Sequence, residues 1–137
     1  MRIVIPPRQY PYPSDGAPTA IRKTGDGFTC LGPAQFHQYF AADPSVEQAA
    51  FMARSQVPNS ADNSKAVITT AVWRSKPSWA LVAAADRTIN PDLERWYVTR
   101  ANSHKVEVEV AGASHSVYVC RPKEVAAMIE EAAARAR

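Results

Sequence analysis

The chain has 137 residues, of which 46% are apolar and 21% charged, and its formal net charge is +3. These values are ordinary for a globular protein, and the length suits one domain or part of a larger one. Basic residues are scattered rather than interleaved with aromatic residues, which argues against nucleic acid as a partner. No apolar run reaches the roughly 18 residues that a membrane span needs. The cysteines, Cys30 and Cys120, form neither a CxxC motif nor a Cys/His cluster, so we expect a reduced, cytoplasmic protein without metal or other cofactor.

The first part of the chain is rich in proline and in turn-forming residues. Five of the 11 prolines fall within the first 18 positions, and turn clusters occupy residues 10–16 and 24–27. Proline removes a backbone donor and interrupts regular elements. Residues 1–32 are therefore expected to be irregular, with Phe28 and Leu31 as packing anchors.

Two short helices are expected next. Pro33 suits the first position of a helix with an aromatic face, formed by Phe36, Tyr39 and Phe40. Asp43 is expected to cap a second helix, which should end before Pro58. A polar stretch follows. We therefore place a boundary near residue 75, between an irregular and helical part (residues 1–75) and a second part (residues 76–137).

The second part alternates strands and helices. The apolar run at residues 77–85 predicts a strand covered on both faces. Asn90 then caps a helix that has Pro91, Asp92 and Glu94 in its first turn. Residues 104–110 alternate strictly and predict a second strand, and Pro122 opens a final helix after a loop at residues 111–116. This order indicates an α/β fold whose two parallel strands need further strands to form a stable sheet.

A carboxylate and an imidazole follow the two predicted strands. Asp86 comes directly after the first strand and His115 after the second. Functional groups in parallel sheets gather beyond the carboxyl ends of the strands, where a carboxylate can orient a basic imidazole. The alternatives are that Asp86 caps a turn and that His115 is a solvated side chain.

Several segments together resemble bacterial α/β-hydrolases of the esterase/haloperoxidase-like type. Residues 76–91 resemble the penultimate strand and acid loop of that family, and residues 112–125 its histidine loop and last helix. The lid of the family is matched by residues 36–40, 50–58 and 71–73. The resemblance implies a partial α/β-hydrolase fold, a helical lid followed by a βαβα half-sheet. It also implies hydrolysis of an ester or related acyl bond, with Asp86 as triad acid and His115 as triad base.

The sequence departs from that family at the nucleophile. Its members carry a serine in a G-x-S-x-G elbow that precedes the lid, and no such motif occurs here. Ser114 adjoins His115 in the sequence, and the segment 117–120 after it has no helical pattern, so we reject Ser114. The cysteines are expected to be inert packing residues. We therefore assign no nucleophile and expect the chain to be inactive alone.

Three hypotheses follow for such a chain: a truncated hydrolase remnant, one half of a split serine hydrolase, or a small interaction module. The partner would be a complementing hydrolase fragment or a second copy joined at the open sheet edge, rather than nucleic acid or membrane. His37 and His104 have no metal-ligand companion at useful spacing. An apolar set is expected to line an acyl pocket, although core packing explains it equally well: Phe36, Phe40, Phe51, Met52 and Trp73.

Overall fold

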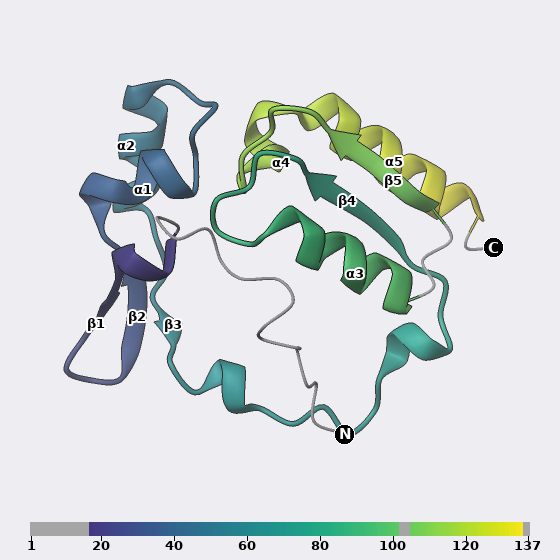
Figure 1. Ribbon diagram of the computed structural model, residues 1–137, viewed down its shortest axis with the longest axis horizontal. Helices are drawn as coiled ribbons and strands as arrows, with labels where there is room; N and C mark the ends of the chain where they lie inside the picture. Colours follow the sequence, from purple (N-terminus) through teal and green to yellow (C-terminus); the bar gives the residue numbers. More distant parts are fainter. Residues whose placement is uncertain (1–16, 102–104, 136–137) are drawn as a thin grey trace.

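The structure, a computed structural model, describes residues 17–101 and 105–135 (Figure 1). An antiparallel sheet of order β1-β2-β3 comes first, built from β1 (Ile21–Lys23), β2 (Phe28–Leu31) and β3 (Asn59–Ser60). A short 3₁₀ helix, Ala17–Ala20, leads into it. The expectation of an irregular segment is therefore wrong for residues 17–31. The rest of that segment lies outside the described residues.

The sequence indicates the turn of the β1–β2 hairpin, but the strands on either side are too short to show a pattern. Gly27 adopts a φ of 88°, and the Thr24 backbone N–H donates to the carbonyl of Phe28 at 2.9 Å. Glycine tolerates such a positive φ, which closes the turn. The two strands have three and four residues, shorter than the runs from which alternation can be recognised. The third strand comes from beyond α2 and is set by tertiary pairing.

Helices α1 (Pro33–Tyr39) and α2 (Val46–Arg54) follow, as expected. The cap of α2 is Ser45 rather than Asp43, because the Ser45 hydroxyl accepts from the backbone N–H of Gln48 at 3.2 Å. A small core joins the two helices, and it consists of Phe36, Ala41, Ala49 and Ala53 with Leu31, Phe40 and Met52 packed against it.

The second part contains β4 (Trp79–Ala83), α3 (Pro91–Ala101), β5 (Lys105–Val110), α4 (Val117–Cys120) and α5 (Pro122–Arg135). Strands β4 and β5 pair in parallel, with Ala83 opposite Val110, as the alternation of elements predicted. Helices α3 and α5 flank this pair (Figure 1). A difference from the sequence-based expectation occurs at α4. Its backbone forms a helical turn although no helix was expected there.

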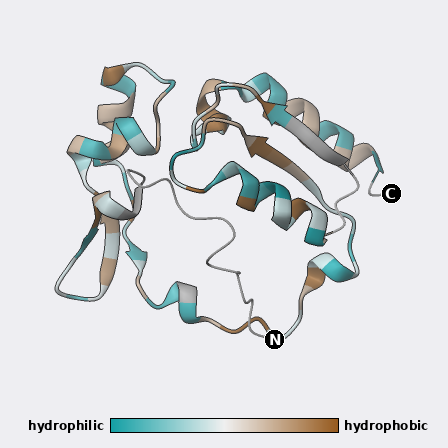
Figure 2. Ribbon diagram, viewed as in Figure 1, coloured by the Kyte–Doolittle hydropathy of each residue, from teal (hydrophilic) through white to brown (hydrophobic). Residues whose placement is uncertain are grey.

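Each part buries its own apolar residues. The second core contains Ala83, Val110 and Ala113, with Leu81 and Val117 against it, and Figure 2 shows the matching hydrophobic colour of β4. Between the two parts runs a long connection with 3₁₀ turns at Asn63–Lys65 and Val72–Arg74. Among the described residues, no helix has the length and apolar character needed to span a bilayer.

Candidate active site

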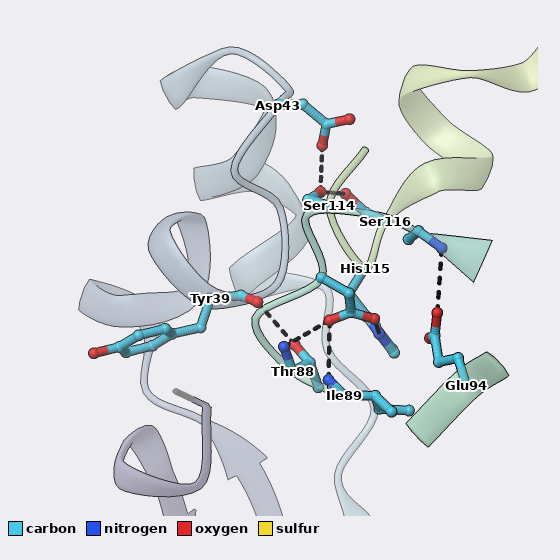
Figure 3. A network of polar contacts seen from close by, with 10 residues as sticks. Tyr39, Asp43, Thr88, Ile89, Glu94, Ser114, His115 and Ser116 are labelled. Atoms are coloured by element: carbon cyan, nitrogen blue, oxygen red, sulfur yellow. Dashed lines mark hydrogen bonds and ion pairs between the residues drawn. The ribbon is translucent and has the colours of Figure 1, made fainter. Parts of the chain in front are cut away.

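Asp86 lies in the loop after β4, where two local donors hold its carboxylate. The backbone N–H groups of Thr88 and Ile89 donate to its Oδ1 at 2.6 and 3.0 Å, and Figure 3 draws both bonds. Aspartate favours such turns because its short side chain reaches backbone donors two or three residues ahead. The residue is only 3% exposed. The turn therefore leaves Oδ2 as the oxygen available to a partner from elsewhere in the chain.

His115 is that partner. Gly112 adopts a φ of 71°, which turns the chain sharply after β5, and the backbone N–H of Ala85 donates to the carbonyl of Ala113 at 3.0 Å. These features bring His115 Nδ1 to 2.6 Å from Asp86 Oδ2. An ionised carboxylate can only accept, so Nδ1 carries the proton and Nε2 is the basic nitrogen. The imidazole side chain is 27% exposed, so it can meet a reacting group while Asp86 stays covered.

The end of α1 braces both loops. The Thr88 hydroxyl donates to the carbonyl of Tyr39 at 2.8 Å, and the Ser116 backbone N–H donates to the carbonyl of Phe40 at 3.0 Å. The Phe40 ring also meets the imidazole of His115 edge to face, with centroids 4.6 Å apart. The lid-like segment is thus attached to the acid loop, the histidine loop and the imidazole itself.

Asp43 makes a further link between the lid-like segment and the histidine loop. Its Oδ1 accepts from the hydroxyl of Ser114, whose oxygen lies 3.1 Å from that of Ser116 (Figure 3). Partial burial acts to raise the pKa of Asp43, but the hydrogen bond from Ser114 and further hydrogen bonds outweigh burial and lower it. Ser114 is almost fully buried and donates to Asp43, so its hydroxyl is not placed to be activated by His115.

Among the described residues, Cys30, Cys120 and His37 make no hydrogen bond to Asp86 or His115 that would add them to the pair. Burial and the nearby charge of Asp43 raise the pKa of the Cys120 thiol, which disfavours a reactive thiolate. Cys30 lies in β2 and is half-buried. His37 Nε2 bonds the carbonyl of Pro44 at 3.2 Å, and His104 lies outside the described residues.

Glu94 lies close to the Asp86–His115 pair. The sequence indicated only that Glu94 belongs to the acidic first turn of α3. The backbone N–H of Ala83 donates to its Oε2 at 3.2 Å, which directs the carboxyl group toward the end of β4. Burial, followed by the charge of Asp86, raises the pKa of Glu94 from 4.5 to about 7. No sequence pattern distinguishes this glutamate from a solvated helix residue, since only the packing of α3 on β4 brings it to Asp86.

Asp86, Glu94 and His115 could in principle hold a divalent cation, since one ligand atom from each lies within 4.8 Å of the others. Two ligands on a tetrahedral zinc ion, each at about 2.0–2.1 Å from the metal, are about 3.3 Å apart. The 2.6 Å between His115 Nδ1 and Asp86 Oδ2 is instead a hydrogen-bond length. The arrangement therefore fits a hydrogen-bonded acid–base pair better than a metal centre.

A cavity of about 410 Å³ lies beside Phe40. Four of the five residues expected in an acyl pocket line it, namely Phe36, Phe40, Phe51 and Met52, and α4 adds Tyr118 and Val119. Phe40 both lines this cavity and contacts the His115 ring. Phe40 is therefore the residue that links this cavity to the candidate base.

Trp73 does not join that set. It lines a separate cavity of about 420 Å³ with Arg74, Lys76 and Arg100, and two guanidinium groups lie 5.1 Å from its ring centre. The reason is topological. Trp73 precedes β4 and sits near its amino end, whereas Asp86 follows the carboxyl end of the same strand.

Comparison with known families shows the family of this chain. The model of the alpha/beta hydrolase family matches residues 2–128. The chain belongs to the alpha/beta hydrolase family. No curated protein matches it. Membership in this hydrolase family agrees with the parallel β4–β5 pair and with an acid and a histidine at the ends of successive strands.

Proposed function

We propose that this chain supplies the acid and the base of an ester- or acyl-bond hydrolase, and that the serine nucleophile comes from outside the 137 residues. The observation that carries the proposal is the 2.6 Å contact between Asp86 Oδ2 and His115 Nδ1. Asp86 orients the imidazole and stabilises the imidazolium, and His115 Nε2 takes the proton of the attacking hydroxyl and returns it to the leaving group. The printed sequence contains no G-x-S-x-G elbow to complete the triad.

The surface supports a partner that completes the fold. Strand β4 pairs, within the described ranges, with β5 alone, and a two-stranded sheet is marginal without further strands. None of the residues of α5 is buried, and Ile129 is 59% exposed. A partner that covers α5 would remove this apolar side chain from water. A polypeptide carrying the elbow and the earlier strands of the fold would extend this sheet and bring its serine to His115.

The apolar cavity beside Phe40 supports a substrate with a hydrophobic acyl group. Its lining residues come from α1, α2 and α4, so the lid-like segment and the segment after the histidine loop share it. The cavity volume of about 410 Å³ falls within the range of small-molecule sites. We therefore place the acyl chain against Phe36, Phe40 and Met52.

The test is complementation. The chain alone should neither turn over a p-nitrophenyl acyl ester nor become labelled by a fluorophosphonate, which reacts with activated serines. If a neighbouring reading frame encodes a polypeptide with a G-x-S-x-G elbow, mixing the two chains should produce both labelling and turnover. Asp86→Asn and His115→Ala should then lower kcat by about 10³-fold or more, while Glu109→Gln, on the exposed side of β5, should not. Labelling of a serine in the isolated chain would refute the proposal.

A further inference from the structure

Four hydrogen-bond donors converge on the Asp86 carboxylate if Glu94 carries a proton. Three of them are already given by the geometry: the backbone N–H groups of Thr88 and Ile89, and Nδ1 of His115. A carboxylate offers about four lone-pair sites. The Glu94 carboxyl group is the remaining neighbour, since one of its oxygens lies within 4.8 Å of the ligand atoms of both Asp86 and His115.

We propose that Glu94 is a positioning residue of the acid–base pair: its protonated carboxyl group donates a hydrogen bond to Asp86 and holds that carboxylate against His115. The inference rests on the proposed function of Asp86 and His115 and extends it by one residue. Glu94 does not touch the reacting atoms. It acts through Asp86.

The surroundings of Glu94 favour the protonated form. One oxygen accepts from the backbone N–H of Ala83, so the carboxyl group is held in place and its other oxygen can carry the proton. The titratable groups that face it are Asp86 and His115. The adjacent cation, Arg95, is directed away, because it pairs with Asp92 at 2.6 Å and with Glu109 at 2.5 Å. Burial and the charge of Asp86 accordingly raise the pKa of Glu94 to about 7.

The geometry of the Asp86–His115 pair should therefore change near neutral pH. Below the Glu94 transition the carboxyl group donates to Asp86. Above it, two carboxylates face each other at short range, and like charges at that distance repel. Either Asp86 or Glu94 must then move, and the Asp86–His115 hydrogen bond weakens.

The experiment follows the imidazole and carboxyl groups by NMR in the full chain, at pH values from 5 to 9, and needs no turnover. In the wild type, the ¹³C carboxyl resonance of Glu94 should titrate near pH 7, and the His115 Nδ1–H resonance should shift or broaden through the same pH range. Glu94→Gln keeps a donor that cannot ionise, so its Nδ1–H resonance should match that of the wild type at pH 5 and differ from it increasingly as the wild-type Glu94 ionises. Glu94→Ala, which lacks the donor, should show the altered resonance at every pH. Glu47→Gln is the matched control, because Glu47 is an exposed glutamate in the first turn of α2, and this variant should behave as the wild type.

The outcomes separate this inference from the function on which it rests. If Asp86→Asn alters the Nδ1–H resonance but Glu94→Gln titrates like the wild type, Glu94 has no positioning role and the acid–base pair stands. A Glu94 carboxyl that titrates at an ordinary pH near 4.5 leads to the same conclusion. If Asp86→Asn leaves the resonance unchanged, the pair does not exist in solution and both proposals fail.

Discussion

Replacing Glu94 by glutamine should change how the stability of the chain depends on pH. The pKa of Glu94 is raised from 4.5 to about 7 in the folded chain, so between these values the folded state binds a proton that the unfolded state releases. The stabilisation linked to this proton is fully present below about pH 4.5, declines as pH rises, and is lost above about pH 7. Glu94→Gln has no such proton, so its stability should not decline in this way.

The size of the effect follows from the difference between the two pKa values. About 2.5 pH units at about 1.36 kcal/mol each would correspond to about 3.4 kcal/mol. Because the Glu94 side chain is only half-buried, solvent screening reduces this figure. We expect a loss of about 1–2 kcal/mol in the wild type between pH 5 and pH 8.5 that the variant does not show.

Urea unfolding of wild type and Glu94→Gln at several pH values measures this difference directly. Other groups that titrate in the same range affect both proteins equally, so only the difference between the two curves is assigned to Glu94. Glu47→Gln, an exposed glutamate in the first turn of α2, serves as a control and should follow the wild type. Parallel pH curves for wild type and Glu94→Gln would refute the reasoning, because they would mean that Glu94 titrates alike in the folded and unfolded chains.

Two further variants test the loops that hold the pair. Thr88→Val removes the hydroxyl that donates to the Tyr39 carbonyl at 2.8 Å and should lower the free energy of unfolding by about 0.5–1.5 kcal/mol in urea; an unchanged midpoint would show that this bond does not brace the acid loop. Gly112→Ala should lower the free energy of unfolding by about 1–2 kcal/mol, measured by thermal unfolding. A φ of 71° is unfavourable for a residue with a Cβ, even though an added Cβ would meet no atom within 4 Å. Gly25→Ala, which also meets nothing within 4 Å, is its control, and equal losses in the two would refute the assignment to backbone conformation.

The order of elements in the second part was predictable because it depends on local patterns. A continuous apolar run, a helix start at Asn90 and Pro91, and a strictly alternating segment predict β4, α3 and β5. The carboxyl ends of parallel strands meet at one edge, which made a pairing of Asp86 and His115 one of the possible interpretations, and the family resemblance favoured it. The 2.6 Å contact between them depends on β4, α3 and β5. Each of these elements can be recognised from a few consecutive residues.

Other features depend on contacts between segments far apart in the chain. Asp43 resembles a helix cap, but its carboxylate meets Ser114, 71 residues away, and the nearer Ser45 takes the cap. Trp73 is a large aromatic residue of the kind that lines apolar pockets, but its position before β4 separates it from the cavity beside Phe40. In both cases the residue type is compatible with two environments. The path of the folded chain places each residue in one of them.

The sequence by itself determined the α/β order, the family resemblance and the two residues that form the candidate acid–base pair, because strand patterns, helix caps and loop motifs are local. Only the tertiary structure decided that Glu94 belongs with this pair, that the end of α1 braces its loops, and that β3 completes an antiparallel sheet. The physical reason is that burial, hydrogen bonding and charge act between groups brought together by folding. Their effect on a residue such as Glu94 depends on those neighbours and not on its place in the chain.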